Sequence, residues 1–272
     1  MSFQRLARSV AASGTPLCIG IDPHPGVVGT DPDAVLRFGR AVIAASAGRV
    51  PAVKPQFAFY EALGWQGMKV LATVCEEARA AGLIVVADAK RGDIGTTAAA
   101  YASATLGPNA PFPADILTVS PFLGLDTLEP FVTTARERDR AIYVLLRTSN
   151  PGSATFQDPA EEPLCDWLSG RSDVAGAVVG ATHADAVVRL RARLPRTAFL
   201  LPGYGTQGGS AETARAAFSG SAGAEGPALV VSARGATLPD QPSELWRDDP
   251  AAWIAARIDL LRADLARAGI GS

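Results

Sequence analysis

Histidine, cysteine and lysine are all scarce in this chain of 272 residues, and the first two shortages each exclude a kind of site. The two histidines, His24 and His183, are too few for a metal site built on imidazole, and we expect both at loops or helix starts. Three widely spaced cysteines without a C-x-x-C pair indicate neither a disulfide framework nor a structural zinc site, which fits a reducing cytoplasm.

Long apolar runs and an excess of one charge are also missing. No segment approaches the length needed to cross a bilayer, and residues 1–14 lack the apolar stretch of an export signal. The net charge of −2 gives no general attraction to nucleic acid or to an anionic membrane. We therefore expect a cytoplasmic protein that binds neither.

The scarcity of lysine makes each lysine informative. Only Lys54, Lys69 and Lys90 occur among 25 basic residues, so arginine fills the ordinary surface positions. Lys69 lies in a helical pattern typical of a surface, whereas Lys54 and Lys90 lie in strand-like contexts, PAVK and IVVADAK. An ammonium can give up a proton and a guanidinium in a protein cannot. We therefore expect the two strand lysines to take part in chemistry.

An apolar run at 83–89 leads directly into Asp88, Lys90 and Asp93, which are spaced D-x-K-x-x-D. Alternation along a strand places the side chains of 88 and 90 on the same face, so a carboxylate and an ammonium lie side by side where the apolar run ends. The alternative is a solvated salt bridge, which stabilises a protein little. The rarity of lysine favours the catalytic interpretation.

Short apolar, β-branched runs recur along the chain and are separated by Ala-rich stretches with helical spacing. The runs expected to be strands are 17–22, 51–57, 83–89, 114–120, 141–147, 174–180, 197–203 and 227–233. Such alternation implies a parallel sheet covered by helices, and this number of units predicts a (β/α)8 TIM barrel formed by a single domain, 1–272. An open doubly wound sheet is the alternative, but IDPHPG after the first run lacks the G-x-G-x-x-G fingerprint.

Segments outside the repeating units complete this prediction. Residues 1–13 are expected to form a short helix before the first strand, and the residues from 251 a closing helix. The stretches 150–160 and 235–250 are rich in turn formers, so we expect irregular loops there, at the active site or as surface insertions.

A barrel gathers its reacting groups at the carboxyl ends of its strands. Polar side chains follow the apolar runs at Asp22, Lys54, Asp88, Lys90, Asp93, Ser120, Thr148 and Ser149. The last two runs supply an anion site, because glycine-rich PGYGTQGG precedes a helix and Arg234 follows the eighth run. Backbone N–H groups around Gly203, Gly205 and Gly208, with the side chains of Gln207 and Arg234, suit a phosphate.

These motifs resemble those of the orotidine 5′-phosphate decarboxylase family, in particular its longer bacterial (type 2) subgroup. ADAKRGDIGTTAAAYA at 87–102 is similar to the family's D-x-K-x-x-D-I signature followed by a threonine. The other matches occur in the expected order: VKPQFAFYE at 53–61, RTSNPG at 147–152, PGYGTQGG at 202–209 and VSARGA at 231–236.

The resemblance implies decarboxylation of orotidine 5′-phosphate to uridine 5′-phosphate, the last step of de novo pyrimidine nucleotide synthesis, without metal or organic cofactor. It implies that Lys90 donates a proton to C6 of the pyrimidine and that Asp88 lies beside the substrate carboxylate. It also implies that Lys54 and Asp93 complete an alternating charge network.

Substrate-binding roles are implied in the same way. Asp22 and Lys54 would hold ribose hydroxyls, Ser149 the pyrimidine edge, and Gln207 and Arg234 the phosphate. The glycine-rich loop at 203–209 would close over the phosphate. Asp93 and Thr97 would reach into the site of a neighbouring subunit and contact its ribose, which makes a homodimer the active unit.

Three alternatives remain open. One is a sugar-phosphate decarboxylase or aldolase with the same D-x-K-x-x-D core that uses magnesium to stabilise an enediolate. Another is a Schiff-base aldolase, although carboxylates on both sides of Lys90 favour its charged ammonium over the free amine that this chemistry needs. The third is a nucleotide-binding protein without catalytic activity, for which two carboxylates beside an anionic ligand have no evident use.

Overall fold

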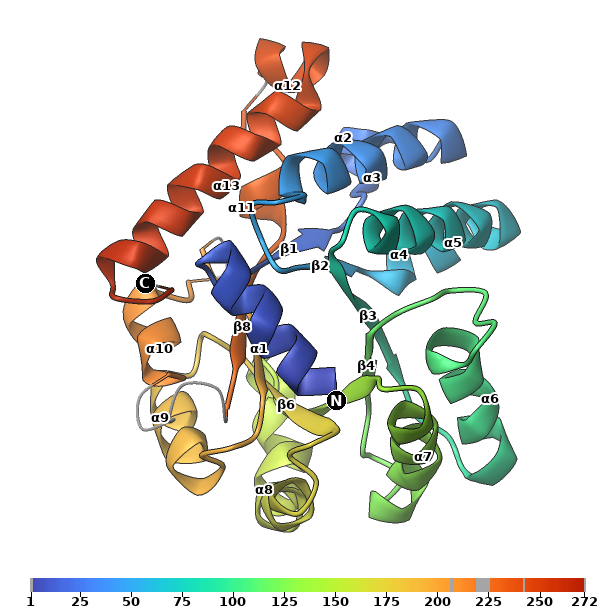
Figure 1. Cartoon of the computed structure of the whole chain (residues 1–272), viewed down its shortest axis with the longest axis vertical. Helices are drawn as coiled ribbons and strands as arrows, with labels where there is room; N and C mark the ends of the chain where they lie inside the picture. The colour runs from blue at the N-terminus through green and yellow to red at the C-terminus, as the bar shows by residue number, and fades with distance from the viewer. Residues whose placement is uncertain (1, 206–207, 219–225, 242, 272) are drawn as a thin grey trace.

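A computed structural model describes residues 2–205, 208–218, 226–241 and 243–271. Eight parallel strands close into a barrel in which each strand pairs with the next along the chain and β8 pairs with β1 (Figure 1). The strands are β1 Leu17–Ile21, β2 Ala52–Pro55, β3 Ile84–Arg91, β4 Ile116–Val119, β5 Ala141–Arg147, β6 Ala175–Val179, β7 Phe199–Pro202 and β8 Ala228–Ser232. Every strand coincides with an expected run, and the predicted (β/α)8 barrel is confirmed.

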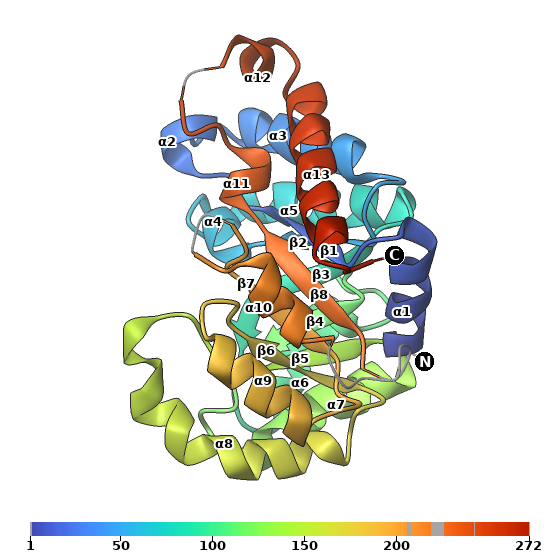
Figure 2. The same cartoon turned by 90° about the vertical axis from the view of Figure 1, so that its left-hand side faces the viewer.

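Helices surround the barrel and connect successive strands (Figures 1 and 2). The longer ones are α3 Pro32–Ser46, α5 Gly64–Ala80, α6 Gly95–Leu106, α7 Glu129–Glu137, α8 Ala154–Ser169, α9 Ala184–Arg193 and α13 Pro250–Arg267. Shorter ones are α2 Pro25–Val28, α4 Phe57–Glu61, η1 Leu125–Leu128, η2 Pro151–Ser153, α10 Ala211–Ala216, α11 Arg234–Thr237 and α12 Glu244–Asp248. Helix α13 is the expected closing helix, and none of the described helices is long and apolar enough to span a membrane.

The N-terminal helix α1, Ser2–Ser13, lies across the end of the barrel that faces the viewer in Figure 1. Its Phe3 and Leu6 are buried with residues inside the barrel, and the ring centroid of Phe3 lies 5.4 Å from that of Tyr143 on β5. Gly176 on β6 leaves room for Tyr143, because a Cβ there would come within 2.6 Å of that ring. Helix α1 therefore covers the amino end of the barrel, opposite the strand ends where barrels carry their active sites.

The sequence predicted an irregular loop at 150–160, and this prediction is wrong. It forms η2 and the first half of α8, which contains Pro159 and Pro163. Each proline removes a helical N–H donor, which favours a loop when read locally. Tertiary contacts override this preference: Leu168 of α8 is buried in the core, and Glu161 accepts a hydrogen bond from Arg147 of β5 at 3.0 Å.

The stretch 235–250 also contains more structure than expected. Helix α11 occupies its start, and α12 begins after Ser243, whose hydroxyl accepts a hydrogen bond from the backbone N–H of Trp246. The indole N–H of Trp246 in turn donates to the carbonyl of Thr237 at 3.0 Å. A serine cap and an anchored tryptophan therefore order part of a segment in which the turn formers dominate the sequence signal.

Candidate functional site

A cavity of about 210 Å³ opens at the carboxyl end of the barrel, and all eight strands or the residues directly after them contribute to its wall. The polar and glycine residues that line it are Asp22, Lys54, Gln56, Asp88, Lys90, Thr118, Thr148, Ser149, Gly180, Gly203, Tyr204 and Arg234. Its apolar wall includes Leu145, Val178, Leu200 and Val231. The cavity therefore has a charged side and an apolar side, as a pocket for an aromatic ring bearing anionic groups requires.

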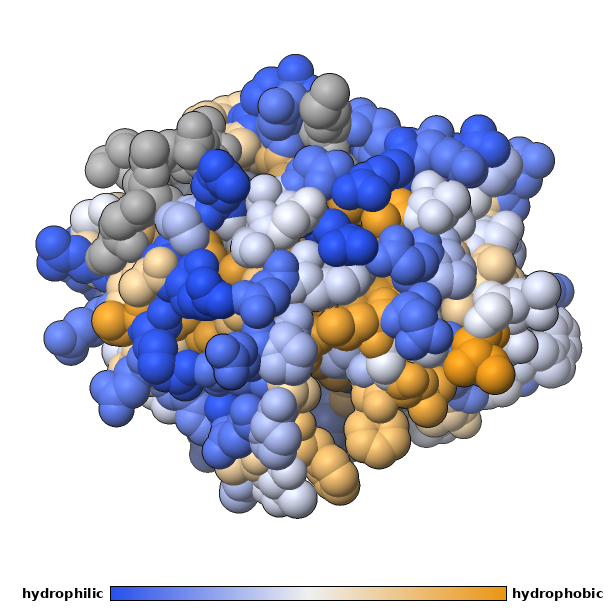
Figure 3. Space-filling model, turned by 90° about the horizontal axis from the view of Figure 1, so that it is seen from below, coloured by the Kyte–Doolittle hydropathy of each residue, from blue (hydrophilic) through white to orange (hydrophobic). Residues whose placement is uncertain are grey.

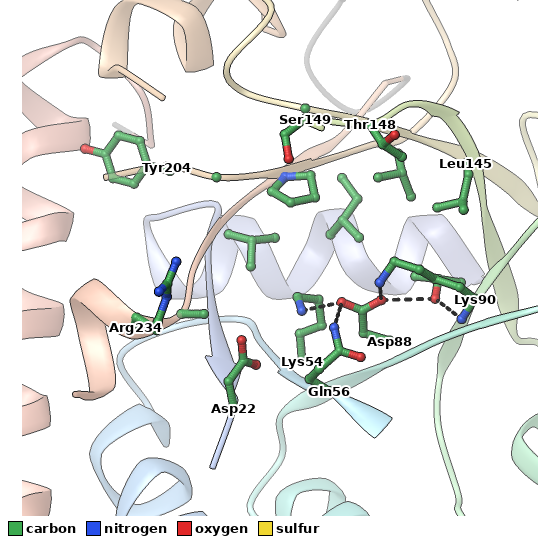
Figure 4. Close-up of a pocket in the computed structure, with 18 residues that line it drawn as sticks. Asp22, Lys54, Gln56, Asp88, Lys90, Leu145, Thr148, Ser149, Tyr204 and Arg234 are labelled. Atoms are coloured by element: carbon green, nitrogen blue, oxygen red, sulfur yellow. Dashed lines mark hydrogen bonds and ion pairs between the residues drawn. The ribbon is translucent and has the colours of Figure 1, made fainter. Parts of the chain in front are cut away.

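Asp88 lies at the centre of the charged side (Figure 4). Its Oδ2 accepts hydrogen bonds from Nζ of Lys54 at 2.6 Å and from Nε2 of Gln56 at 2.9 Å, and its Oδ1 accepts one from Nζ of Lys90. The strand positions explain this convergence. Lys54 and Asp88 lie in the carboxyl halves of the neighbouring strands β2 and β3, and Gln56 forms a parallel bridge with Asp88.

The ionisation of this cluster follows from its geometry. Burial alone raises the pKa of Asp88, but the charges of Lys54 and Lys90 and their hydrogen bonds outweigh it and hold that pKa below its usual range. Burial opposes the charged form of Lys54, yet Asp88 and Asp22 together raise its pKa above the ordinary value. The pocket therefore contains a carboxylate between ammonium groups at neutral pH.

Asp22 and Arg234 lie beside this cluster, at the ends of β1 and β8. Burial raises the pKa of Asp22, partly opposed by the charge of Lys54, and its Oδ1 is buried without a hydrogen-bond partner among the described residues. Arg234 begins α11 and its side chain extends along the same side of the pocket as Asp22 (Figure 4). Gly20 permits this approach, because a Cβ at position 20 would lie 2.4 Å from Cβ of Ala233.

The glycine-rich segment 203–209 follows β7 and begins at the wall of the cavity. Gly203, Gly205 and Gly208 have φ values of 99°, 86° and 90°, which only glycine adopts readily. The N–H of Gly209 donates to the carbonyl of Gly203 at 3.0 Å, so the two ends of the loop are held together. Gly203 lines the cavity, whereas Gly205 and Gly208 are absent from its wall, and Gln207 lies outside the described residues.

Comparison with known proteins agrees with this geometry. Residues 15–248 match the model of the orotidine 5′-phosphate decarboxylase / HUMPS family. The chain belongs to this family. It is 41% identical over 260 residues to orotidine 5′-phosphate decarboxylase of Rhodopirellula baltica, covering 84% of this chain and 85% of that one. The enzyme of the same name from Salinispora arenicola is 39% identical over 287 residues, with 98% of both chains covered.

Solved structures show the same relationship. A crystal structure assigned to orotidine 5′-phosphate decarboxylase from Streptomyces avermitilis matches with a TM-score of 0.81 and 35% identity, covering 96% of this chain and 95% of that one. The family resemblance that the D-x-K-x-x-D motif carried is therefore confirmed, and so is its bacterial character.

Two residues that the family resemblance assigns to the substrate lie away from this cavity. Asp93 and Thr97 are not among the lining residues. The Oδ1 of Asp93 accepts a hydrogen bond from the N–H of Ile94 at 2.8 Å, and Thr97 is exposed on α6. Within one copy of the orotidine 5′-phosphate decarboxylase fold, the structure thus brings Lys54, Asp88 and Lys90 together without these two.

The histidines lie at helix starts, as expected. His24 accepts a hydrogen bond from Gly26 at the start of α2, and Nε2 of His183, which precedes α9, lies 3.0 Å from the carbonyl of Thr148. Within the described ranges, no group of three or more histidine, cysteine, aspartate or glutamate side chains could hold a metal ion. Ser149 lines the cavity, while Ser120 does not.

Sequence reasoning did not single out Gln56, Thr118 and Tyr204 in this family's pocket, and the first two lie beside the charged cluster. Gln56 directly follows β2 in the matched segment VKPQFAFYE, so its place after a strand was a usable signal. Thr118 lies inside the apolar run 114–120 and is only 2% exposed, so nothing local separates it from a core threonine. Both contact Asp88 or its neighbours on β3.

Proposed function

We propose that this chain decarboxylates orotidine 5′-phosphate to uridine 5′-phosphate and CO₂ in the cytoplasm, as one barrel domain and without a metal or organic cofactor. The observation that carries the proposal is Asp88, held as a carboxylate between two ammonium groups inside a pocket at the strand ends. Family membership identifies orotidine 5′-phosphate as the substrate for this arrangement.

The reaction demands such a cluster. When the C6–carboxylate bond breaks, its electron pair remains on C6 as a vinylic carbanion that the ring carbonyls delocalise poorly. A preorganised ammonium stabilises that charge without reorganising, which is the largest catalytic term in many enzymes. Lys90 then gives a proton from Nζ to C6, and its neutral amine regains a proton from solvent.

The three cluster residues divide these tasks. The side chain of Lys54 is 5% exposed and Lys90 46%, so Lys54 is fixed against Asp88 while Lys90 faces the open cavity. Lys90 is therefore the proton donor, and Lys54 holds Asp88 in place and charged. Asp88 orients both ammonium groups and lies where the substrate carboxylate leaves.

Substrate binding uses the other polar lining residues. The unpartnered buried Oδ1 of Asp22 suits a ribose hydroxyl donor, in concert with Lys54. Ser149, opposite the charged cluster in Figure 4, holds the pyrimidine edge. Arg234 and the glycine-rich loop with Gln207 bind the phosphate, whose binding energy is available to close the loop over the reaction.

We further propose a homodimer in which Asp93 and Thr97 act in the neighbouring subunit's site. Ile94, 64% exposed, directly precedes α6, and Thr97 and Tyr101 share a face of that helix. Phe122, 71% exposed after β4, stacks edge-on with exposed Phe156. Figure 3 views the side where α7 and α8 lie and shows hydrophobic surface among hydrophilic residues. Apolar side chains of this kind favour burial against a second copy.

An ultraviolet assay tests the proposed reaction. Orotidine 5′-phosphate is added with a chelator, and loss of the orotate chromophore is followed. We expect turnover that the chelator does not reduce. Absence of turnover, together with magnesium-dependent activity on a sugar phosphate, would assign the pocket to the metal-dependent reaction instead, and tight binding of uridine 5′-phosphate without any turnover would indicate a binding protein.

A further inference from the structure

The backbone of Lys90 adopts an unusual conformation. Its φ is 49°, and among the described residues other than glycine only Asp139 shares the left-handed region. This region is sterically unfavourable for a residue with a long side chain, and it persists only where the surroundings enforce it. The more exposed of the two lysines in the charged cluster is thus also one of the two described residues other than glycine with this backbone conformation.

A break in the barrel register accompanies this conformation. Ala87 of β3 pairs with Leu117 of β4, but the next pair is Arg91 with Val119. Residues 88–90 of β3 therefore face Thr118 alone, which is a bulge in a parallel pair. Bulges beside active sites redirect a side chain, and here the bulge lies on the D-x-K segment itself.

The side chain of Thr118 replaces the hydrogen bonds that the bulge removes. Its Oγ1 accepts from the N–H of Ala89 at 3.0 Å and from the N–H of Lys90 at 2.9 Å. The hydroxyl has a single proton to donate, and both the carbonyl of Ala87 and Oδ1 of Asp88 lie 3.3 Å away. One buried hydroxyl thus contacts every residue from 87 to 90.

We propose that Thr118 is a positioning residue that holds Lys90 in its left-handed conformation and so fixes the ammonium against Asp88. A hydroxyl is needed because only an atom with two free lone pairs and one proton can accept both N–H groups and still donate. Valine has the same shape but leaves the amides of Ala89 and Lys90 without an acceptor. The extended conformation then becomes competitive at Lys90, and its ammonium spends less time at the reacting carbon.

This proposal rests on the proposed function of Lys90, so its test combines kinetics with a measurement that needs no turnover. We expect Thr118→Val to lower kcat roughly 10- to 100-fold, because a misplacement of about 1 Å costs that much. KM and the affinity for uridine 5′-phosphate should stay within about twofold, because Thr118 acts on proton delivery. Thr118→Ser, which keeps the hydroxyl, should retain kcat within about threefold.

Amide hydrogen exchange provides the independent measurement. The amides of Ala89 and Lys90 should exchange at least about 10-fold faster in Thr118→Val than in the parent or in Thr118→Ser. Thr105→Val is the control, because Thr105 is also a buried threonine, on α6, whose hydroxyl bonds only to backbone carbonyls of its own helix. Its kcat and the exchange at 89 and 90 should match the parent.

Several results would overturn the proposal. Parental kcat in Thr118→Val would do so, as would equal losses in Thr118→Ser, or unchanged exchange at Ala89 and Lys90. If Thr118→Val does not fold, Thr118→Ala and Thr118→Ser form a second pair that differs only in the hydroxyl, and equal kcat in this pair would count against it. If the chain does not decarboxylate orotidine 5′-phosphate at all, the proposed function fails, while the exchange experiment still decides whether Thr118 holds the Lys90 backbone.

Discussion

Nζ of Lys54 lies 2.6 Å from Oδ2 of Asp88, and this ion pair joins the carboxyl halves of β2 and β3 while only 4% of Lys54 and 7% of Asp88 is exposed. Buried charges persist only when they are paired and hydrogen-bonded, because desolvation of each is expensive. Gln56 and Lys90 donate further hydrogen bonds to Asp88. The protein thus maintains a carboxylate inside a pocket that admits an anionic substrate.

Stability should depend on pH through Asp88. Its pKa is lower in the folded chain than in the unfolded one, so between these values the unfolded chain binds more protons. The contribution of Asp88 is therefore complete above about pH 4 and is lost as pH falls toward the folded pKa. Urea unfolding from roughly pH 6 to pH 3 should show a slope up to about 1.4 kcal/mol per pH unit steeper in the parent than in Asp88→Asn. Equal slopes would show that Asp88 carries no such linkage.

Lys90→Ala should largely abolish decarboxylation and preserve the binding of uridine 5′-phosphate. Loss of the proton donor lowers kcat by roughly 10²- to 10⁴-fold, whereas uridine 5′-phosphate, which lacks the carboxylate, should still bind because Asp22, Ser149 and Arg234 remain. Turnover is measured by loss of the orotate chromophore, and product binding by calorimetry.

The matched control for this substitution is Lys69→Ala. Lys69 is the one lysine outside the cavity, exposed on α5 with its Nζ 4.6 Å from the ring centroid of Trp65. It should keep parental kcat. Parental activity in Lys90→Ala, or equal losses in both variants, would contradict the assignment of Lys90 as proton donor.

The sequence predicts the barrel and the charged cluster for related reasons. Short apolar, β-branched runs that alternate with amphipathic stretches favour buried strands, and a chain that uses arginine at most basic positions has lysine at 54 and 90. Strand alternation then places Asp88 beside Lys90. The features that the sequence does not predict depend on contacts between distant segments. One is the left-handed backbone at Lys90, which needs Thr118 of the next strand.

The helix α8 illustrates the same limit. Pro159 and Pro163 predict a break, because local propensity registers only the lost N–H groups. Packing of Leu164 and Leu168 against the barrel is a tertiary effect that decides the outcome and has no local signature. The proposed roles of Asp93 and Thr97 are harder still to predict from one sequence, since they would require a second chain.

Arg234→Ala should reduce activity through the phosphate. Loss of a charge-assisted clamp lowers kcat/KM roughly 10- to 100-fold on orotidine 5′-phosphate. On orotidine, which has no phosphate, the parent and Arg234→Ala should have similar kcat/KM values. Arg37→Ala is the control, because the Arg37 side chain is 71% exposed and its ion pair with Asp31 is long at 4.0 Å. An equal loss on both substrates would place Arg234 elsewhere in the mechanism.

Mixed dimers test the proposal that Asp93 acts across a subunit interface. Lys90→Ala and Asp93→Ala should each be inactive alone. In a heterodimer of the two, one site combines Lys90 of one chain with Asp93 of the other and is intact, while the second site carries both defects. Co-expression with two different affinity tags and sequential purification isolates this heterodimer. It should regain about half of the parental activity, because one of its two symmetric sites is complete.

The matched control is a heterodimer of Lys90→Ala with Asp88→Ala. These two residues contact each other within one chain, so each site of this heterodimer carries a single defect and activity should stay absent. If the Lys90→Ala and Asp93→Ala heterodimer were equally inactive, Asp93 would act in its own chain. That result would require a rearrangement of the segment after β3, because Asp93 is not part of the cavity wall in a single copy. Restored activity would show instead that Asp93, in the segment between β3 and α6, completes the site of a second chain.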